Sequence, residues 1–275
     1  MKSLLSFASL IVVLLFFASC AKHPYAATNK QYKRQAKQLA KTIQAEPRVT
    51  VSADSLKYPQ QWVGTTNFGL RRPSYVIIHH TAQNSCAQTL KTFTLQRTQV
   101  SAHYVICKDG TLHHMLNDYL RAWHAGNSRW GGMTDINSAS IGIEIDNNGK
   151  DSFSTAQINT LLGLLDTLKN SYHIPAQNFI GHADIAPGRK VDPNVHFPWK
   201  LLADHGFGVW YEDTSSILLP QDFNSLHALR IIGYNIQRPE QARQSFRLHF
   251  LSSEAKGEWT EEEKKVLYAV MLKYL

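Results

Sequence analysis

The apolar run from Tyr75 to Ile78 is followed directly by His79 and His80, and this junction constrains the fold more than any other short stretch. The run is rich in β-branched and aromatic side chains and has no helical period, which is typical of a buried strand in a mixed sheet. Because successive side chains of a strand point to opposite faces, the two histidines cannot enter the same site. We therefore expect one functional histidine here and one that fills space.

Three further stretches have the character of strands. Residues 102–115 alternate apolar and polar side chains around Asp109-Gly110, a dipeptide that predicts a hairpin turn. Residues 140–146 also alternate, and residues 178–182 form a short strand that ends in a histidine. Together with the run before His79, these stretches predict a mixed central sheet.

Helical patterns lie between the predicted strands. Residues 154–173 place leucine and isoleucine on one helical face behind an N-cap at Ser154 or Thr155, and residues 86–96 also have helical character. Residues 183–199 contain three prolines and are predicted to form a loop without regular structure. The fold class is therefore α/β, a mixed central sheet flanked by helices.

Pro220 begins a segment of different character. Three helices are predicted, over 223–234, over 239–250 and from Thr260 onward, and Thr260 with Glu263 fits a capping box. We expect these helices to form a small all-α domain at the C-terminal end of the chain.

The N-terminal residues are typical of an export leader. Lys2 precedes an apolar run over residues 4–19, which is shorter than the roughly 20 residues of a membrane span and fits a signal peptide. The run ends in Phe-Ala-Ser-Cys, which resembles a bacterial lipobox with Cys20 as the lipidated residue. An ordinary cleavage site beside a chance cysteine is the alternative. Of the other cysteines, Cys86 and Cys107 could form a disulfide, which their spacing alone does not decide.

The basic charge of the chain is concentrated near the leader. The sequence pI is about 9.3, yet residues 21–45 hold six basic side chains and no acidic one. Without these six and Lys2, 22 of the 29 basic residues remain against 21 acidic ones. A basic segment of this kind is a solvated tether that can touch anionic lipid or wall polymer. It gives no support to nucleic-acid binding.

Several titratable residues stand where predicted strands end. They are His79, Glu144, His182, and Lys190 and Asp192 in the loop that follows. Strand ends that meet at one edge of a sheet commonly form a site, and two imidazoles with one carboxylate are a catalytic zinc set. A chance scatter of the thirteen histidines remains the alternative from spacing alone.

Five segments occur in a characteristic order, namely VIIHHTA, SAHYVICKDG, AWHAGNSRW, SIGIEI and GHADIAPGRKVDP. From about Tyr75 to Trp199 the chain resembles the zinc-dependent N-acetylmuramoyl-L-alanine amidases of the type 2 family, whose relatives include phage lysozyme-type amidases and animal peptidoglycan recognition proteins. The last of the five segments is highly specific for this family.

The resemblance implies one zinc ion per chain. His79, His182 and Asp192 match the metal ligands of the family, and His80 is then the neighbour that faces away. Asp184 is a second candidate for the carboxylate ligand, but the position within the motif favours Asp192.

The resemblance also implies catalytic and substrate-binding roles. Glu144 matches the residue that transfers the proton, and Lys190 matches the one that stabilises the oxyanion. His103 and Tyr104 belong to a segment that lines the substrate cleft in the family, although a buried aromatic on a strand is commonly part of a core. His124 lies in a Gly-rich loop and is a further candidate for binding substrate.

The C-terminal helices resemble the three-helix peptidoglycan-binding domain of outer-membrane lipoprotein amidases, although any small helical bundle needs a similar apolar pattern. A helical appendage that only stabilises the enzyme is the alternative. The expected organisation is a lipoprotein signal peptide (1–20), a basic tether (21–60), a zinc amidase domain (61–215) and a peptidoglycan-binding-like domain (216–275).

The predicted function is zinc-dependent hydrolysis of the amide between N-acetylmuramic acid and L-alanine in peptidoglycan or muropeptides. The expected protein is a monomer held by lipid in the cell envelope, at the outer membrane facing the periplasm. Two alternatives are a non-catalytic peptidoglycan-recognition protein and a cytoplasmic recycling amidase, and the leader argues against the second.

Overall fold

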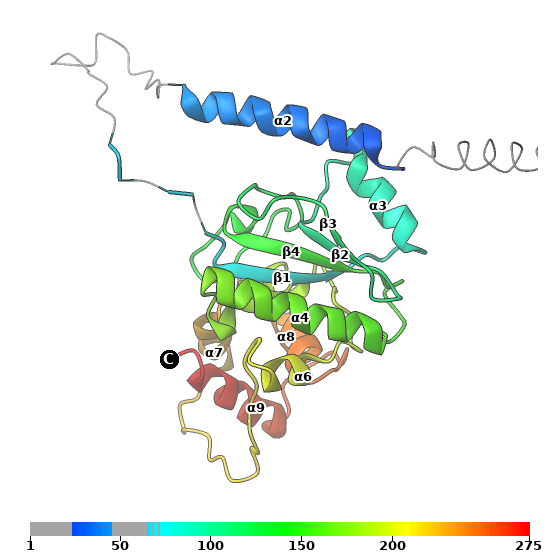
Figure 1. The fold of residues 1–275 in the computed structure, drawn as a ribbon. Helices are drawn as coiled ribbons and strands as arrows, with labels where there is room; N and C mark the ends of the chain where they lie inside the picture. Colours follow the sequence, from blue (N-terminus) through cyan, green and yellow to red (C-terminus); the bar gives the residue numbers. More distant parts are fainter. Residues whose placement is uncertain (1–23, 46–64, 68, 71) are drawn as a thin grey trace, which may run out of the picture. The chain divides into compact units, whose positions relative to one another are not determined.

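The computed structural model describes residues 24–45, 65–67, 69–70 and 72–275 (Figure 1). The chain divides into two units, Met1–Phe68 and Gly69–Leu275. The predicted signal peptide and the lipidation of Cys20 lie outside the described residues. Among the residues that are described, no helix is both long and apolar enough to cross a membrane.

Helix α2 (Ala26–Gln44) lies in the basic segment for which the sequence predicts only a tether. The segment is composed largely of alanine, lysine and glutamine, which are strong helix formers. None of its residues is buried. The tether therefore contains a regular, exposed helix.

A five-stranded sheet forms the centre of the second unit, and it confirms the predicted strands and hairpin. Its strand order is β3-β2-β4-β1-β5. The strands are β1 (Tyr75–His80), β2 (Tyr104–Ile106), β3 (Leu112–His114), β4 (Ser140–Ile145) and β5 (Phe179–Gly181). All neighbouring pairs are parallel except β2 and β3, the predicted hairpin. The carboxyl ends of four strands therefore meet at one edge of the sheet.

Helix α4 (Thr155–Tyr172) covers one face of the sheet. Ser154 and Gln157 form a capping box that fixes the start of this helix. Its apolar side chains, among them Leu161 and Leu165, are buried against Val76 and Ile78 of β1 in one hydrophobic cluster. The helical spacing in the sequence predicts this packing correctly.

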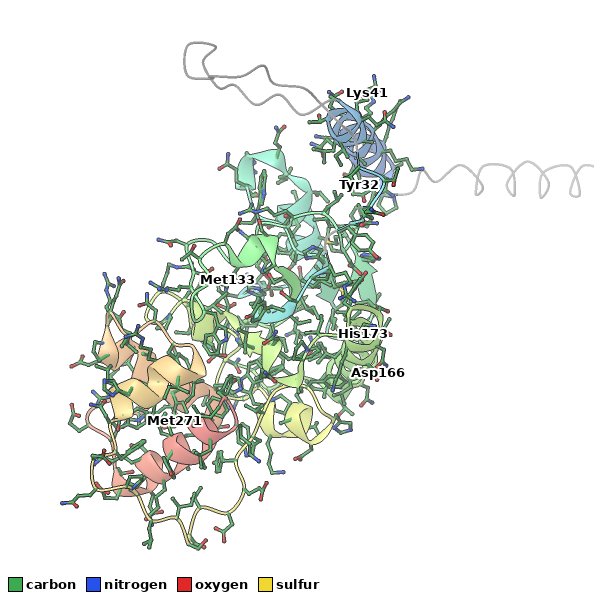
Figure 2. The ribbon with its side chains drawn as sticks, turned by 90° about the vertical axis from the view of Figure 1, so that its left-hand side faces the viewer. Tyr32, Lys41, Met133, Asp166, His173 and Met271 are labelled. Atoms are coloured by element: carbon green, nitrogen blue, oxygen red, sulfur yellow. A yellow bond between two sulfur atoms is a disulfide. The ribbon has the colours of Figure 1, made fainter. Side chains whose placement is uncertain are left out.

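The C-terminal helices cover the opposite face. These are α7 (Ser225–Ile232), α8 (Pro239–Phe250) and α9 (Glu261–Leu272). A second cluster joins Ile77 and Ile180 of the sheet to Phe246 of α8 and Leu267 of α9. Figure 2 shows α4, near the labels of Asp166 and His173, and α9, near Met271, on opposite sides of the sheet. Because α7, α8 and α9 pack on the sheet, they stabilise the part of the unit that holds the strand ends.

The prediction of an irregular loop over 183–199 is wrong at its beginning and at its last residue. A single helical turn, α5 (His182–Ile185), starts directly after β5, and α6 (Trp199–Asp204) begins at Trp199. The carboxylate of Asp184 accepts a hydrogen bond from Gly181 N at 2.7 Å. The Asp184 side chain thus caps the first turn of α5. The number of prolines in the segment does not reveal this turn.

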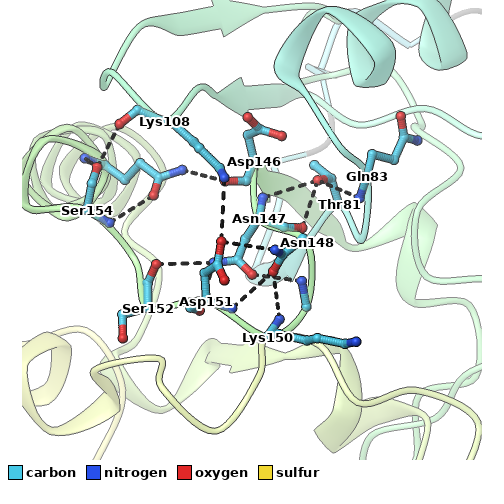
Figure 3. Close-up of polar contacts among 12 residues, drawn as sticks. Thr81, Gln83, Lys108, Asp146, Asn147, Asn148, Lys150, Asp151, Ser152 and Ser154 are labelled. Carbon is cyan, nitrogen blue, oxygen red and sulfur yellow. Dashed lines mark hydrogen bonds and ion pairs between the residues drawn. The ribbon is translucent and has the colours of Figure 1, made fainter.

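Side-chain hydrogen bonds hold the segment that leaves β4 (Figure 3). Asn147 Nδ2 donates to Asp151 O at 2.9 Å, and Asn148 Oδ1 accepts from the amides of Lys150 and Asp151. Ser154 Oγ donates to Lys108 O of the hairpin at 2.7 Å. These bonds fix the end of β4 relative to the hairpin and to α4.

A disulfide joins Cys86, at the first residue of α3 (Cys86–Thr94), to Cys107 just after β2. This pairing was open at the level of the sequence. The disulfide connects the start of α3 to the residue that follows β2.

Candidate metal centre and active site

Three side chains meet where β1 and β5 end. His79 lies near the end of β1, His182 follows β5, and Asp192 lies ten residues further along the chain. His79 Nδ1 is 2.9 Å from His182 Nδ1 and 3.0 Å from Asp192 Oδ2, and the same carboxylate oxygen is 3.0 Å from His182 Nδ1. All three residues are buried. We call this group the His79–His182–Asp192 trio.

The chemistry of the trio fits a metal ion. Burial, reinforced by the nearby His182, lowers the pKa of His79 to about 4, so its ring is neutral at pH 7. Burial alone would raise the pKa of Asp192, but the close contacts of its carboxylate with His182 and His79 hold that pKa well below its usual range. A neutral imidazole and a carboxylate are metal-binding forms. Three donor atoms of the N and O type, close together, match a catalytic metal set.

His80 lies on the other face of the sheet and takes no part in the trio. Its Nδ1 accepts a hydrogen bond from Asn194 N at 3.1 Å, and its ring is almost fully buried. Strand alternation therefore separates the two adjacent histidines, as the sequence predicts.

Glu144 lies beside His79 on the neighbouring strand. The two residues are paired in the parallel register of β1 and β4, so their side chains point to the same face. Glu144 Oε2 is enclosed and has no hydrogen-bond partner among the described residues. Burial, reinforced by the charge of Asp192 and opposed by that of Lys190, raises the pKa of Glu144 to about 8. A carboxyl group with a pKa near neutral pH and a free oxygen has the properties of a general acid–base group.

Lys190 lies in the loop between α5 and Asp192. Its backbone amide donates to Ala186 O at 3.1 Å. Its positive charge opposes protonation of both His79 and Glu144. The loop thus places a cation near the trio.

His124 is buried beneath the trio, although its Gly-rich loop suggests an exposed cleft residue. Its Nδ1 lies 3.0 Å from His79 Nε2, and its Nε2 lies 3.2 Å from Ser140 Oγ. Burial, followed by the proximity of His79, holds the pKa of His124 well below its usual value. The ring is therefore neutral at pH 7 and contacts a trio residue.

His103 and Tyr104 lie away from the trio. The ring of His103 is fully buried, and it accepts from Gly142 N at 3.1 Å and contacts Leu120 O at 2.9 Å. Tyr104 is buried in the cluster under α4, and its hydroxyl donates to Asp118 at 2.9 Å. These contacts occupy both ring nitrogens and the hydroxyl, so the geometry gives their predicted substrate contacts no support.

Asp184, the alternative carboxylate, is directed elsewhere. Besides capping α5, it accepts from Tyr234 Oη at 2.7 Å and pairs with His249 Nδ1 at 2.7 Å. Tyr234 follows α7, and His249 lies on α8. Asp184 thus connects the turn that carries His182 to the C-terminal helices, and sequence reasoning did not identify either partner.

The family model described as N-acetylmuramoyl-L-alanine amidase matches residues 69–195, which include the whole trio. The N-acetylmuramoyl-L-alanine amidase AmiD of Escherichia coli strain K12 is 32% identical over 234 residues, covering 74% of this chain and 84% of that protein. The chain belongs to the N-acetylmuramoyl-L-alanine amidase family. The 1,6-anhydro-N-acetylmuramyl-L-alanine amidase AmpD of Haemophilus influenzae is 36% identical over 107 residues, or 38% of this chain and 58% of AmpD.

Solved structures of family members have the same fold. AmiD from E. coli, in complex with anhydro-N-acetylmuramic acid-L-Ala-D-γ-Glu-L-Lys, matches with a TM-score of 0.67 and 29% identity, over 77% of this chain and 93% of that one. AmpDh3 from Pseudomonas aeruginosa, in complex with an anhydromuramic pentapeptide, matches with a TM-score of 0.67 and 28% identity, over 82% and 99%. Both matches cover more of the chain than the 127 residues of the family model.

Proposed function

We propose that this amidase hydrolyses the amide between N-acetylmuramic acid and L-alanine with one zinc ion held by the His79–His182–Asp192 trio. Membership of the family supports the reaction. The observation that carries the zinc proposal is the convergence of two imidazole nitrogens and one carboxylate oxygen within 3.0 Å of one another.

Each residue of the site has a role in the proposed mechanism. Zinc, when bound by the trio, supplies a Lewis acid that lowers the pKa of water and polarises the amide carbonyl. Glu144 accepts the proton of the attacking water at its free Oε2 and passes it to the nitrogen of the leaving L-alanine. Lys190 stabilises the negative charge that develops on the carbonyl oxygen.

The proposed substrates are muropeptides, including those that end in 1,6-anhydro-N-acetylmuramic acid. The solved structures of AmiD and AmpDh3 are complexes with anhydromuramyl peptides. The C-terminal helices support a second contact with peptidoglycan. They carry a pocket lined in part by Trp259, Arg238 and Gln241.

The proposed location is the periplasmic side of the outer membrane, where a monomer is anchored by lipid on Cys20. The export leader and the lipobox-like residues before Cys20 support this location. The residue after the cysteine is Ala21, not the aspartate of an inner-membrane retention signal. Cys20→Ala removes the residue that would carry the lipid. The variant should therefore leave the membrane fraction, because stable anchoring requires several acyl chains. Equal solubility of the wild type and this variant would contradict the anchor.

The alternative, a protein that only recognises peptidoglycan, predicts no product. Mass spectrometry of muropeptides after digestion with the zinc-loaded protein separates the two functions. We expect free stem peptides that begin with L-alanine, together with sugars that have lost their peptides. A Glu144→Gln variant that retains zinc is the control, and it should leave the muropeptides intact. Unchanged muropeptides after treatment with zinc-loaded wild type would favour the recognition protein.

A further inference from the structure

Both histidines of the trio make a second contact with one short loop. His79 Nε2 lies 3.0 Å from His124 Nδ1, and His182 Nε2 lies 3.1 Å from the carbonyl oxygen of Ala125. His124 and Ala125 are consecutive residues. Two consecutive residues, one through its side chain and one through its backbone carbonyl, therefore contact Nε2 of the two rings, while Nδ1 of each ring faces the other members of the trio.

The proton positions in these contacts follow from which atoms can only accept. The carbonyl of Ala125 has no proton, so His182 Nε2 must donate to it. In the neutral ring, Nδ1 of His182 then carries a lone pair. That lone pair is directed into the trio.

The same reasoning applies to His79 through a longer chain of contacts. Ser140 Oγ donates to Ile136 O at 2.7 Å, which leaves the hydroxyl oxygen to accept from His124 Nε2 at 3.2 Å. In the neutral ring of His124, Nδ1 is then an acceptor, and His79 Nε2 donates to it. The lone pair of His79 is left on Nδ1, which faces the trio.

One side chain, that of Asn137, holds the backbone of both contact residues. Asn137 Oδ1 accepts from His124 N at 3.0 Å and from Ala125 N at 2.9 Å. The ring of His124 packs directly on Gly142 of β4, where any side chain would collide with it. Asn137 thus holds the backbone of both contact residues, Gly142 leaves room for the ring of His124, and Arg189 Nη2 donates a further hydrogen bond to Ala125 O at 2.8 Å.

We infer that residues 122–126 form a clamp that fixes the tautomer and orientation of both histidine ligands, with Ser140 and Asn137 holding the clamp in place. This inference rests on the metal-binding role in the proposed function. Hydrogen bonds of this kind to ligating histidines commonly contribute 10–100-fold to metal affinity. His124 is accordingly a positioning residue, and this role replaces the substrate-binding role that its loop suggests.

The test compares two buried histidines. His124→Leu removes the acceptor for His79, whereas His103→Leu removes a histidine of similar burial whose hydrogen bonds are to backbone atoms outside the trio. Zinc affinity, measured by competition with a chromophoric chelator, should fall about 10–100-fold for His124→Leu and remain near the wild-type value for His103→Leu. His124→Asn places an amide oxygen close to the lost acceptor and should recover part of the affinity. A zinc affinity of His124→Leu equal to those of the wild type and His103→Leu would overturn the clamp.

A second readout needs no zinc. ¹⁵N NMR of the ring nitrogens in the metal-free protein should show the proton of His79 on Nε2 in the wild type. In His124→Leu the carboxylate of Asp192, 3.0 Å from His79 Nδ1, should draw the proton to that nitrogen. Ser140→Ala, which keeps the ring of His124, should give a mixture of the two tautomers and serves if His124→Leu does not fold. The same tautomer in the wild type and in these variants would contradict the inference.

The two readouts separate the clamp from the proposed function. A wild-type protein that binds no zinc would refute the metal-binding role, and the tautomer of His79 would still test the clamp. A wild type that binds zinc with a tautomer independent of His124 would refute the clamp alone.

Discussion

The two faces of the central sheet are built in different ways, and β1 shows the difference residue by residue. Val76 and Ile78 point into the apolar cluster under α4, with His80 as a buried residue at the end of that face. Ile77 and His79 point to the other face, where the apolar packing continues into the trio. Two adjacent residues of the same type therefore have different roles because of strand alternation alone.

The face under α4 is packed through apolar side chains, whereas the face that holds His79 combines the apolar cluster of the C-terminal helices with hydrogen bonds around the trio. Leu161 and Leu165 are fully buried, and their apolar side chains need no hydrogen-bond partners. On the other face, His79 is held by His124, and His182 by the carbonyl of Ala125. Substitutions on the first face should therefore change stability, and those on the second should change metal binding and catalysis.

The largest expected difference is between His79 and His80. His79→Ala removes one of three ligands and should abolish zinc binding and activity, because a catalytic site needs its full ligand set. His80→Ala should leave zinc content nearly unchanged, since the ring faces the other side of the sheet. Metal analysis of both purified variants checks this, and loss of zinc from His80→Ala with retention in His79→Ala would reverse the assignment.

Glu144→Gln should separate catalysis from metal binding. The variant keeps the shape of the side chain but cannot accept a proton, so turnover should fall by about 10²–10⁴-fold. Its zinc content should equal that of the wild type, because Glu144 is not a member of the trio. Turnover on purified peptidoglycan gives the rate, and full activity in a zinc-containing variant would mean that another residue is the base.

Lys190→Ala should have a smaller effect than Glu144→Gln. Loss of one group that stabilises the oxyanion typically slows a reaction by about 10²–10³-fold. Zinc content and muropeptide binding should be retained, since Lys190 is not part of the trio. Lys200→Ala is a matched control, because this lysine pairs with Asp204 on the surface. Equal rates for Lys190→Ala and the wild type would remove Lys190 from the mechanism.

The pH dependence of stability should also differ between the two faces. The pKa of Glu144 is raised from 4.5 to about 8 in the folded, metal-free protein. The folded state thus holds a proton that the unfolded state releases, and the free energy of unfolding should decrease as pH rises from about 4.5 to about 8. Glu144→Gln should lack this contribution, so the difference between wild type and variant should change with pH.

Leu165→Ala, on the face under α4, is the control for this measurement. It should lower the free energy of unfolding by about 2–5 kcal/mol and by nearly the same amount at each pH. Chemical denaturation in the presence of a chelator provides both comparisons. A wild type and a Glu144→Gln variant with parallel pH profiles would contradict the raised pKa.

The sequence predicts the apolar face more completely than the site. The spacing of Leu161, Leu165 and their neighbours predicts α4 and its buried face, because one periodic pattern encodes both. The three trio residues could be named through resemblance to the family. Their meeting depends on the parallel pairing of β1 with β5, which spacing along the chain does not specify.

The contacts around the trio were beyond sequence reasoning for a physical reason. The contact to His182 is a backbone carbonyl, which every residue possesses, so Ala125 carries no signature of its role. His124 has a recognisable side chain, but its Gly-rich loop suggests an exposed residue. The loop is held in place by hydrogen bonds from His124 N and Ala125 N to Asn137, which lies thirteen and twelve positions further along the chain. The single turn of α5 was missed because it depends on one capping carboxylate, Asp184.

The most direct test of the account is to measure zinc content and amidase activity in the same preparation of the wild-type protein. The protein is purified without chelator, and the appearance of new L-alanine amino termini in peptidoglycan is followed before zinc removal, after it and after zinc is restored. We predict about one zinc per chain, as a three-ligand site would hold, with activity that disappears and returns with the metal. A protein that contains no zinc and gains no activity when zinc is added would contradict the account.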